Sequence, residues 1–180
     1  MQDFEIQNGV LIHYHGSDSN VIIPDNVTSL GEMAFYKCRS LISVTVPSGV
    51  TSIGRGCFGY CDKLQSVSLS NGLTTIEDNA FLNCDNLKQI DIPNTVITIG
   101  DMAFSNCSGL ITLKISNSVT HLGDMVCSWC ISLESVTIPN SVETIGDGAF
   151  SYCESLKISV PKTVKKIGAD AFFGCLKVSQ

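Results

Sequence analysis

Apolar residues recur in a pattern that repeats along nearly the whole chain. From Val21 onwards the sequence can be written in rows of 23 residues, in which the same positions are apolar each time. Each row carries a Leu-x-x-Val-x-Ile run, then Val-x-x-Ile-Gly, and finally Ala-Phe-x-x-Cys. The first run predicts a short, half-buried strand, and the last predicts a turn or one helical turn. A repeat of this length predicts a stack of small similar units.

Two columns of large or sulfur-bearing side chains show the repeat most clearly. The cysteine column has five steps of 23 residues and a last step of 22: Cys38, Cys61, Cys84, Cys107, Cys130, Cys153 and Cys175. The aromatic column contains Phe35, Phe58, Phe81, Phe104, Phe150 and Phe172, with Cys127 in the place of a seventh phenylalanine. One row alone cannot bury these side chains, so we expect them to form a ladder in the core of stacked rows. The sequence therefore predicts a repeat solenoid of seven rows over residues 21–180.

Proline and glycine mark the turns of each row. All five prolines follow the first strand, and Ser70 and Ser116 take the two remaining places in that column. The glycine after the second apolar pair, such as Gly146, is expected to supply a turn with positive φ. Glu77 replaces one glycine, and row six lacks one residue near Lys157. We expect these departures to bend or loosen single coils without changing the fold.

The two ends of the chain do not follow the pattern. Residues 1–20 contain two apolar alternations around Asn8-Gly9, which predicts a hairpin that caps the first coil. After Cys175 the next Leu-x-x-Val-x-Ile run is missing. An open coil end can meet another subunit, so self-association through the C-terminal end is a further expectation.

Composition excludes several classes of partner. The 180 residues include 11 basic and 17 acidic side chains, and the formal net charge is −6. Without a block of Lys or Arg, we expect no nucleic-acid partner and no binding to an anionic membrane. No run of 18 apolar residues exists, and residues 1–5 lack the start of a secretory signal. We expect this segment neither to insert into a membrane nor to direct secretion, so a cytoplasmic location stays open on the residues alone.

The rows resemble the leucine-rich repeats of the BspA-like family. The shared pattern is Val-x-Ile-Pro-x-x-Val-x-x-Ile-Gly-x-x-Ala-Phe-x-x-Cys-x-x-Leu, and it covers residues 21–175. The resemblance implies a right-handed coil with short parallel strands on one face and turns or short helical turns on the other. It also implies a cell-surface or secreted protein, because family members are mostly modular surface proteins that bind host or matrix proteins and other cells. This functional inference is analogy, since a fold alone does not define a function.

No arrangement of residues predicts catalysis or a cofactor. Cys127-Ser-Trp-Cys130 is a C-x-x-C motif, but each cysteine falls on an apolar column, which favours buried thiols over a redox or zinc site. Stacked cysteines in one column lie close enough for a disulfide, so spacing alone does not exclude bridging. His13 and His15 share a face without a third ligand, and the loop around Asp18 has one carboxylate, too few for calcium. Asn26 and Asn106 begin glycosylation sequons, and whether either is modified stays open.

Two surfaces are candidates for binding a partner. Along the strands, the outward positions carry mostly Ser and Thr, and the larger polar groups Gln89, Asp91 and Lys114 lie near the middle. The position before each ladder cysteine varies from Gly to Trp, so the core does not require a large group there. It places Trp129 beside Tyr152, with Tyr60 further along, and exposed Trp and Tyr often anchor partners. The alternative is that the rings of Trp129 and Tyr152 only pack on each other.

Three functional hypotheses follow from the sequence. The first is a non-enzymatic interaction module of a surface adhesion or host- or matrix-binding protein, whose protein or glycan ligand the sequence does not identify. The second is a structural spacer without a ligand of its own. The third is a thiol redox protein that uses Cys127 and Cys130, which the register of the rows disfavours.

Overall fold

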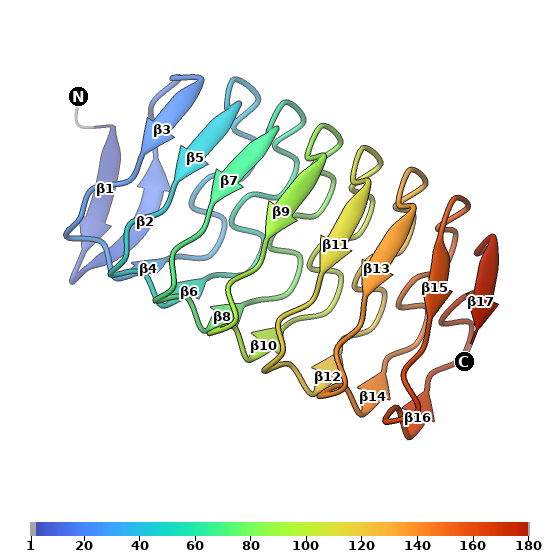
Figure 1. Ribbon diagram of the computed structural model, residues 1–180. Helices are drawn as coiled ribbons and strands as arrows, with labels where there is room; N and C mark the ends of the chain where they lie inside the picture. The colour runs from blue at the N-terminus through green and yellow to red at the C-terminus, as the bar shows by residue number, and fades with distance from the viewer. Residues whose placement is uncertain (1–2, 180) are drawn as a thin grey trace.

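A computed structural model describes residues 3–179 as a solenoid of seven coils with a strand hairpin at its N-terminal end (Figure 1). Each coil contributes one strand to a long sheet and a shorter strand to a second sheet, and turns close the coil. The described residues contain no helix, so the part of each coil after the second strand is a turn. The prediction of a leucine-rich-repeat solenoid with an N-terminal hairpin is confirmed.

The strands have the following bounds. The hairpin consists of β1 (Phe4–Gln7) and β2 (Val10–Tyr14). The long sheet runs through β3 (Asn20–Ile22), β5 (Ser43–Thr45), β7 (Ser66–Ser68), β9 (Gln89–Asp91), β11 (Thr112–Lys114), β13 (Ser135–Thr137), β15 (Lys157–Ser159) and β17 (Lys177–Ser179). The second sheet runs through β4 (Ser29–Leu30), β6 (Ser52–Ile53), β8 (Thr75–Ile76), β10 (Thr98–Ile99), β12 (His121–Leu122), β14 (Thr144–Ile145) and β16 (Lys166–Ile167).

Neighbouring coils pair in parallel with a register that matches the sequence repeat. In the long sheet, Val44 of β5 lies opposite Val67 of β7, and Ile90 of β9 lies opposite Leu113 of β11. The hydrogen-bonded pairing is interrupted between β7 and β9 and between β13 and β15 in the long sheet, and between β10 and β12 in the second sheet. Only the interruption between β13 and β15 lies where row six lacks one residue, and the strands on both sides of each interruption stay in contact.

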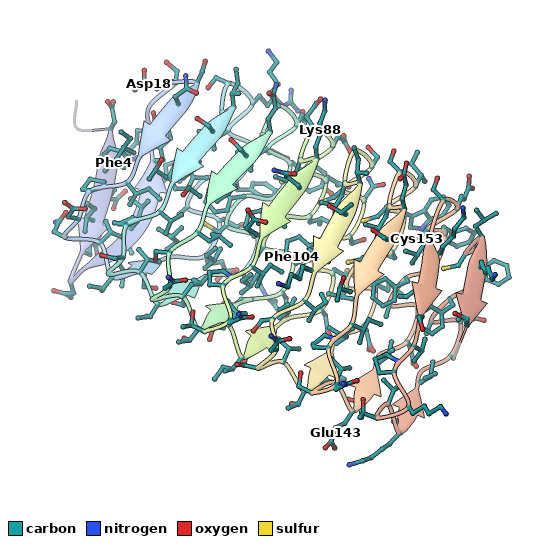
Figure 2. All side chains as sticks on the ribbon, viewed as in Figure 1. Phe4, Asp18, Lys88, Phe104, Glu143 and Cys153 are labelled. Carbon is teal, nitrogen blue, oxygen red and sulfur yellow. The ribbon has the colours of Figure 1, made fainter. Side chains whose placement is uncertain are left out.

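The core is a set of side-chain columns that run through all seven coils (Figure 2). Adjacent phenylalanine rings stack: Phe58 and Phe81 have centroids 5.2 Å apart, and Phe81 and Phe104 have centroids 5.3 Å apart. Five of the six column phenylalanines are fully buried, whereas Phe172 in the last coil is half-buried. In coil five the slot is filled by Cys127, preceded by Val126 where most coils have Ala, and both are fully buried.

The hairpin does more than cover the first coil. Asn8 and Gly9 both have positive φ, as the favoured two-residue hairpin turn requires. β2 then pairs in parallel with β4, and Tyr14 donates its backbone N–H to Ala34 over 2.9 Å, as Phe35 does to Cys57. Phe4, Tyr14 and Phe35 continue the aromatic stack, with centroids 5.1 Å apart at each step. β2 is therefore half a coil of the solenoid, which the sequence pattern did not indicate.

The glycine column has a different cause from the one expected. Gly146 does not have positive φ; the glycines that do are Gly9, Gly56, Gly148 and Gly174. At Gly146 an added Cβ would lie 2.4 Å from Asp124 Oδ1 and 2.7 Å from the Asp124 backbone nitrogen. At Gly146 adjacent coils therefore approach each other too closely for an added side chain, although coil three carries Glu77 in this column, and the expectation of a positive-φ turn at Gly146 was wrong.

The two serines in the proline column form hydrogen bonds between coils. Ser70 Oγ donates to the Pro47 carbonyl over 3.0 Å, and Ser116 Oγ donates to the Val96 carbonyl over 2.7 Å. At these two positions a serine hydroxyl donates a hydrogen bond to a carbonyl of the neighbouring coil. In the other coils a proline ring ends the strand at this place.

The C-terminal segment continues the long sheet further than the sequence suggested. Although the next Leu-x-x-Val-x-Ile run is absent, β17 pairs in parallel with β15, with Val178 opposite Ile158. The last coil exposes Ile167, Phe173, Leu176 and Val178. Self-association at this end stays a prediction.

Candidate binding surface

Each coil contains two residues with left-handed backbone conformation, both on the turn side. The first precedes the Ala column, and the second precedes the ladder cysteine. At the second position φ lies between 57° and 61° in six coils, and the residues are Lys37, Tyr60, Asn83, Asn106, Trp129 and Tyr152. We call these six residues the edge row. Because their backbone conformations match, their side chains leave the solenoid in the same direction, one coil apart.

The largest side chains of the edge row are Trp129 and Tyr152 in coils five and six. Their rings stack with centroids 4.1 Å apart and an angle of 16° between the planes. Tyr152 also contacts Phe173 edge-on at 5.3 Å. Trp129 is 49% exposed, whereas Tyr152 is half-buried. The structure therefore brings the two predicted residues together at the surface, in contact with each other.

Tyr60 lies three coils away in the same row. Its ring meets Tyr36 edge-on at 5.5 Å, and Lys37 Nζ lies 5.7 Å from the Tyr60 centroid and 5.0 Å from the Tyr36 centroid. Beside this pair Gly56 and Gly59 leave a surface hollow of about 340 Å³. Tyr60 thus belongs to a separate aromatic group at the N-terminal half of the row.

The other predicted residues lie on the long sheet. Gln89, Asp91 and Lys114 are all exposed, and Asp91 is directly opposite Lys114 in the parallel register. A shallow hollow of about 420 Å³ extends over β5, β7 and β9 and includes Gln89 and Asp91. The structure does not bring this group near Trp129, because the sheet and the edge row lie on different sides of the coil.

Comparison with known proteins establishes the family. The BspA type leucine-rich repeat region matches in six copies, over residues 11–130 and 120–180. The chain belongs to the BspA-type leucine-rich repeat family. A search of curated proteins found no significant match.

Solved structures of leucine-rich repeat proteins share the fold. A leucine-rich repeat protein of T. pallidum is 33% identical over 92% of this chain and 80% of its own, with a TM-score of 0.89. One from Bacteroides ovatus is 31% identical over 96% of this chain but only 48% of its own, with a TM-score of 0.85. The pneumococcal vaccine antigen PcpA, at 21% identity and a TM-score of 0.65, shows similarity of fold alone.

In this BspA-type chain the cysteine column is a ladder of thiol hydrogen bonds. All nine cysteines are free, and the ladder cysteines are buried except at the two ends, where Cys38 and Cys175 are half-buried. Cys61 Sγ donates to the Phe35 carbonyl over 3.1 Å, and the same bond recurs in each later coil. Burial raises the pKa of Cys61 to about 12 and that of Cys38 to about 11. Protonated thiols of this kind are poor nucleophiles.

The C-x-x-C motif follows the same columns. Cys127 and Cys130 are both fully buried. The hydrogen bond with Cys127, together with burial, raises the pKa of Cys130 well above its usual value. For Cys127 that hydrogen bond lowers the pKa, but burial and neighbouring thiols outweigh it, so the pKa is again raised. A redox thiol needs the opposite shift and solvent access, so the geometry gives no support to redox chemistry at this pair.

Metal ligands do not gather elsewhere in the part of the chain that the structure describes. Over residues 3–179, no group of three or more His, Cys, Asp or Glu side chains is placed to hold a metal ion. His13 and His15 lie 4.6 Å apart by ring centroids, and His15 pairs with Glu5 over 3.3 Å. The same residues contain no helix long and apolar enough to cross a membrane. Both sequon asparagines, Asn26 and Asn106, are exposed, whereas Cys107 between Asn106 and Ser108 is buried.

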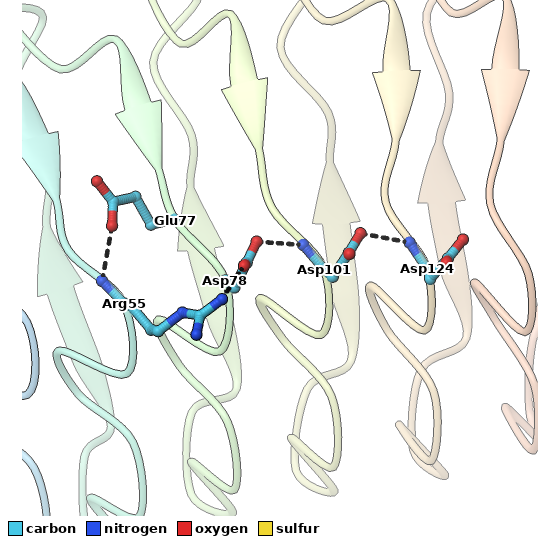
Figure 3. Close-up of polar contacts among 5 residues, drawn as sticks. All are labelled: Arg55, Glu77, Asp78, Asp101 and Asp124. Carbon is cyan, nitrogen blue, oxygen red and sulfur yellow. Dashed lines mark hydrogen bonds and ion pairs between the residues drawn. The ribbon is translucent and has the colours of Figure 1, made fainter.

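A row of aspartates links the turns after the second sheet (Figure 3). Asp101 donates its backbone N–H to Asp78 Oδ1 over 3.0 Å, and Asp124 donates to Asp101 Oδ1 over 2.8 Å. Asp147 and Ala169 continue the series over 2.8 Å each. At its N-terminal end, Arg55 Nη2 pairs with Asp78 Oδ2 over 2.7 Å. Sequence reasoning missed this ladder, although aspartate after glycine in coils four to six was a visible signal.

Proposed function

We propose that this chain is a non-enzymatic interaction module of a cell-surface or secreted adhesion protein, and that Trp129 and Tyr152 form its partner contact. Members of a repeat family present extended surfaces built from repeated positions, and recognition is their usual role. The partner is a macromolecule of a host, a matrix or another cell.

The observation that carries this proposal is the exposure of Trp129 at a left-handed backbone position. A bulky residue there is a conformational outlier, and three other coils place Asn or Gly in the same slot, whereas the remaining three place Lys37, Tyr60 and Tyr152. The packing of Phe and Cys columns does not depend on the slot. The core therefore does not require the ring, and half-exposed Trp and Tyr are among the residue types that contribute most to binding energy at interfaces.

The test is a binding screen against immobilised matrix proteins and glycans, with the natural chain and Trp129→Ala side by side. Trp129→Ala should weaken the interaction by about 2 kcal/mol or more, which is roughly 30-fold, while its free energy of unfolding falls by no more than the about 0.5–1.5 kcal/mol of the lost ring stack. A variant that melts earlier but binds equally well would show that Trp129 only packs against Tyr152.

A structural spacer is the second candidate function. The outward positions of β5, β7 and β13 are small hydroxyl side chains, and such columns serve to solvate a sheet. If the screen yields no partner for the chain, the spacer role replaces the interaction module.

A further inference from the structure

The hollow beside Tyr36 and Tyr60 exists because coil two lacks two side chains that other coils have. Coil two is the only coil with glycine both at the first left-handed position, Gly56, and three residues later, at Gly59. Apart from its chain neighbours, a Cβ added at Gly56 would have one atom within 4 Å, the Met33 Cγ at 3.5 Å. The space beside Gly56 is therefore open, and we call it the coil-two hollow.

The walls of the coil-two hollow are largely apolar and come from three successive coils. Coil one contributes Met33 and Tyr36, coil two contributes Tyr60, and coil three contributes Leu82. The two tyrosine rings meet edge-on, with centroids 5.5 Å apart, so each limits the movement of the other. Met33 is 45% exposed, and its flexible thioether can adapt to the shape of a ligand. A pocket of this kind suits a single large apolar side chain of a partner.

Carboxylates outnumber basic groups at the Arg55 end of the hollow (Figure 3). Arg55 Nη2 pairs with Asp78 Oδ2 over 2.7 Å, and the Arg55 backbone N–H donates to Glu77 Oε2 over 3.0 Å. The hydrogen bond with Asp78 raises the pKa of Arg55, and the charges of Glu32 and Glu77 add to this shift. Three carboxylates therefore act on one guanidinium, and this end of the hollow favours a basic ligand group.

Glu32 is the carboxylate best placed to receive such a group. Its side chain lines the hollow and is exposed, and among residues 3–179 it forms no ion pair. Lys37 contacts the two tyrosine rings but does not line the hollow. Asn79 also lines it, and an amide side chain offers donors and an acceptor to a peptide backbone.

We propose that the coil-two hollow binds a peptide segment of a partner protein, which inserts one large apolar side chain and places an adjacent Lys or Arg against Glu32. The net charge of −6 also favours approach of a basic segment. This site goes beyond the proposed function, because it lies three coils away from Trp129 and none of its lining residues belongs to that contact.

The first experiment uses short peptides that differ at one position. The isotope-labelled 180-residue protein is titrated with peptides Gly-Ser-Lys-X-Ser-Gly, in which X is Leu, Phe or Ala, and NMR follows the backbone amide signals of Gly56 and Gly59. We expect saturable shifts with the Leu or the Phe peptide, and binding at least about tenfold weaker with the Ala peptide. No shift with either apolar peptide, or equal binding of the Ala peptide, overturns the proposal.

The basic residue of the peptide is tested separately. Replacing its Lys by Glu should weaken binding by about threefold or more, as expected for an exposed charge contact. In Glu32→Gln this preference for Lys should shrink, whereas Glu134→Gln, an exposed carboxylate of coil five, changes the net charge equally and should keep it. A preference that is absent in the natural chain, or unchanged in Glu32→Gln, overturns the proposal.

Filling the hollow provides a second test that keeps the backbone conformation. Asn79 has φ of 58° in the same column, so Gly56→Asn, at φ of 59°, should fold with an unchanged urea midpoint. We expect it to weaken binding of the apolar peptide at least about tenfold. Gly148→Asn, at φ of 58° in coil six, is the matched control and should bind as the natural chain does. Equal binding by Gly56→Asn, or equal loss in both variants, overturns the proposal.

A second copy of this chain is the competing occupant. The exposed Leu176 is followed by Lys177, so the C-terminal end carries the same pair of residue types. Self-association in analytical ultracentrifugation that Gly56→Asn abolishes would overturn the proposal of a separate partner. Trp129→Ala should bind the peptides as the natural chain does, so failure of the peptide site and failure of the proposed function are distinguishable.

Discussion

At Trp129 the left-handed backbone costs stability, whereas the stack of the ring on Tyr152 adds stability. Substitutions at this position can separate the two effects. Trp129→Asn removes the stack on Tyr152, which is worth about 0.5–1.5 kcal/mol, but relieves a left-handed conformation of roughly similar cost. We expect the free energy of unfolding to change by less than about 1 kcal/mol, as measured by urea denaturation. Trp129→Ala also removes the stack but keeps the cost of the left-handed conformation, so it serves as the control. A loss above about 2 kcal/mol in the Asn variant would show that the ring stabilises the coil.

The buried thiols predict a loss of stability in alkali. Burial raises the pKa of Cys61 to about 12, whereas an unfolded thiol titrates near 8.5. Below the unfolded value both states stay protonated and stability is complete. Above it the unfolded chain loses protons first, so stability falls as pH rises, by about 1.4 kcal/mol per pH unit for such a thiol. Urea midpoints at pH 7.5 and pH 10 measure this fall.

The control for the alkaline fall is Cys84→Ala. Burial also raises the Cys84 pKa well above its usual value, so the variant has one such thiol fewer and its midpoint should fall less between the two pH values. A natural chain with equal midpoints at both would contradict the assignment.

At the scale of the element, coil five allows a test of whether the sizes of two adjacent buried side chains compensate each other. Val126 and Cys127 replace the Ala-Phe pair and are fully buried. Cys127→Phe alone should overpack the slot and cost about 1–3 kcal/mol. The double change with Val126→Ala should recover most of this loss, because it restores the pair found in neighbouring coils. Additive losses in a double-mutant cycle would show that the two slots are independent.

The glycine column makes a second prediction for the coil. In Gly123→Ala the new Cβ would lie 2.5 Å from Asp101 Oδ1 and 3.0 Å from the Asp101 nitrogen, so the coils must shift. We expect a cost of about 1–3 kcal/mol by chemical denaturation. Gly49→Ala is the control, since its Cβ would meet only ordinary contacts, the nearest at 3.4 Å. Equal stability of the two variants would refute the close-approach explanation.

Sequence reasoning succeeded where the repeat itself carries the information. The period places every Phe and Cys in a column, and stacking follows because no single row can bury them. It failed where conformation depends on the neighbouring coil. The close approach at Gly146, the bond from Ser116 to Val96 and the part of β2 in the stack are contacts between rows that the pattern of one row does not encode.

The candidate site was predictable only in part. The variable slot pointed to Trp129 and Tyr152, and their adjacency followed from the period. Their left-handed backbone and the bond between Asn83 and Asn106 needed coordinates, because aromatic residues have no local preference for positive φ.

For the whole molecule, we expect a substitution in one coil to destabilise that coil and its neighbours more than distant coils. Phe104 stacks on Phe81, and the next coil has Cys127 in the same slot, so the ring has a phenylalanine partner on one side. Phe104→Ala should cost about 3–5 kcal/mol. Hydrogen exchange measured by mass spectrometry should rise first around β9 to β12 and last in the hairpin, since each coil contacts only its neighbours. A uniform rise along the chain would indicate a single cooperative unit.

Because the backbone conformation of the edge row is constant, its exposed side chains can differ from coil to coil without changing the buried columns that stabilise the fold. Each coil presents one edge-row side chain on the same backbone conformation, so the order of the coils determines the order of these side chains on the surface. Exchanging Asn106 with Trp129 would keep composition, charge and all buried columns, and yet change the order of the side chains along the edge row. Such a scaffold can acquire new specificities by shuffling whole repeats, without the core having to adapt.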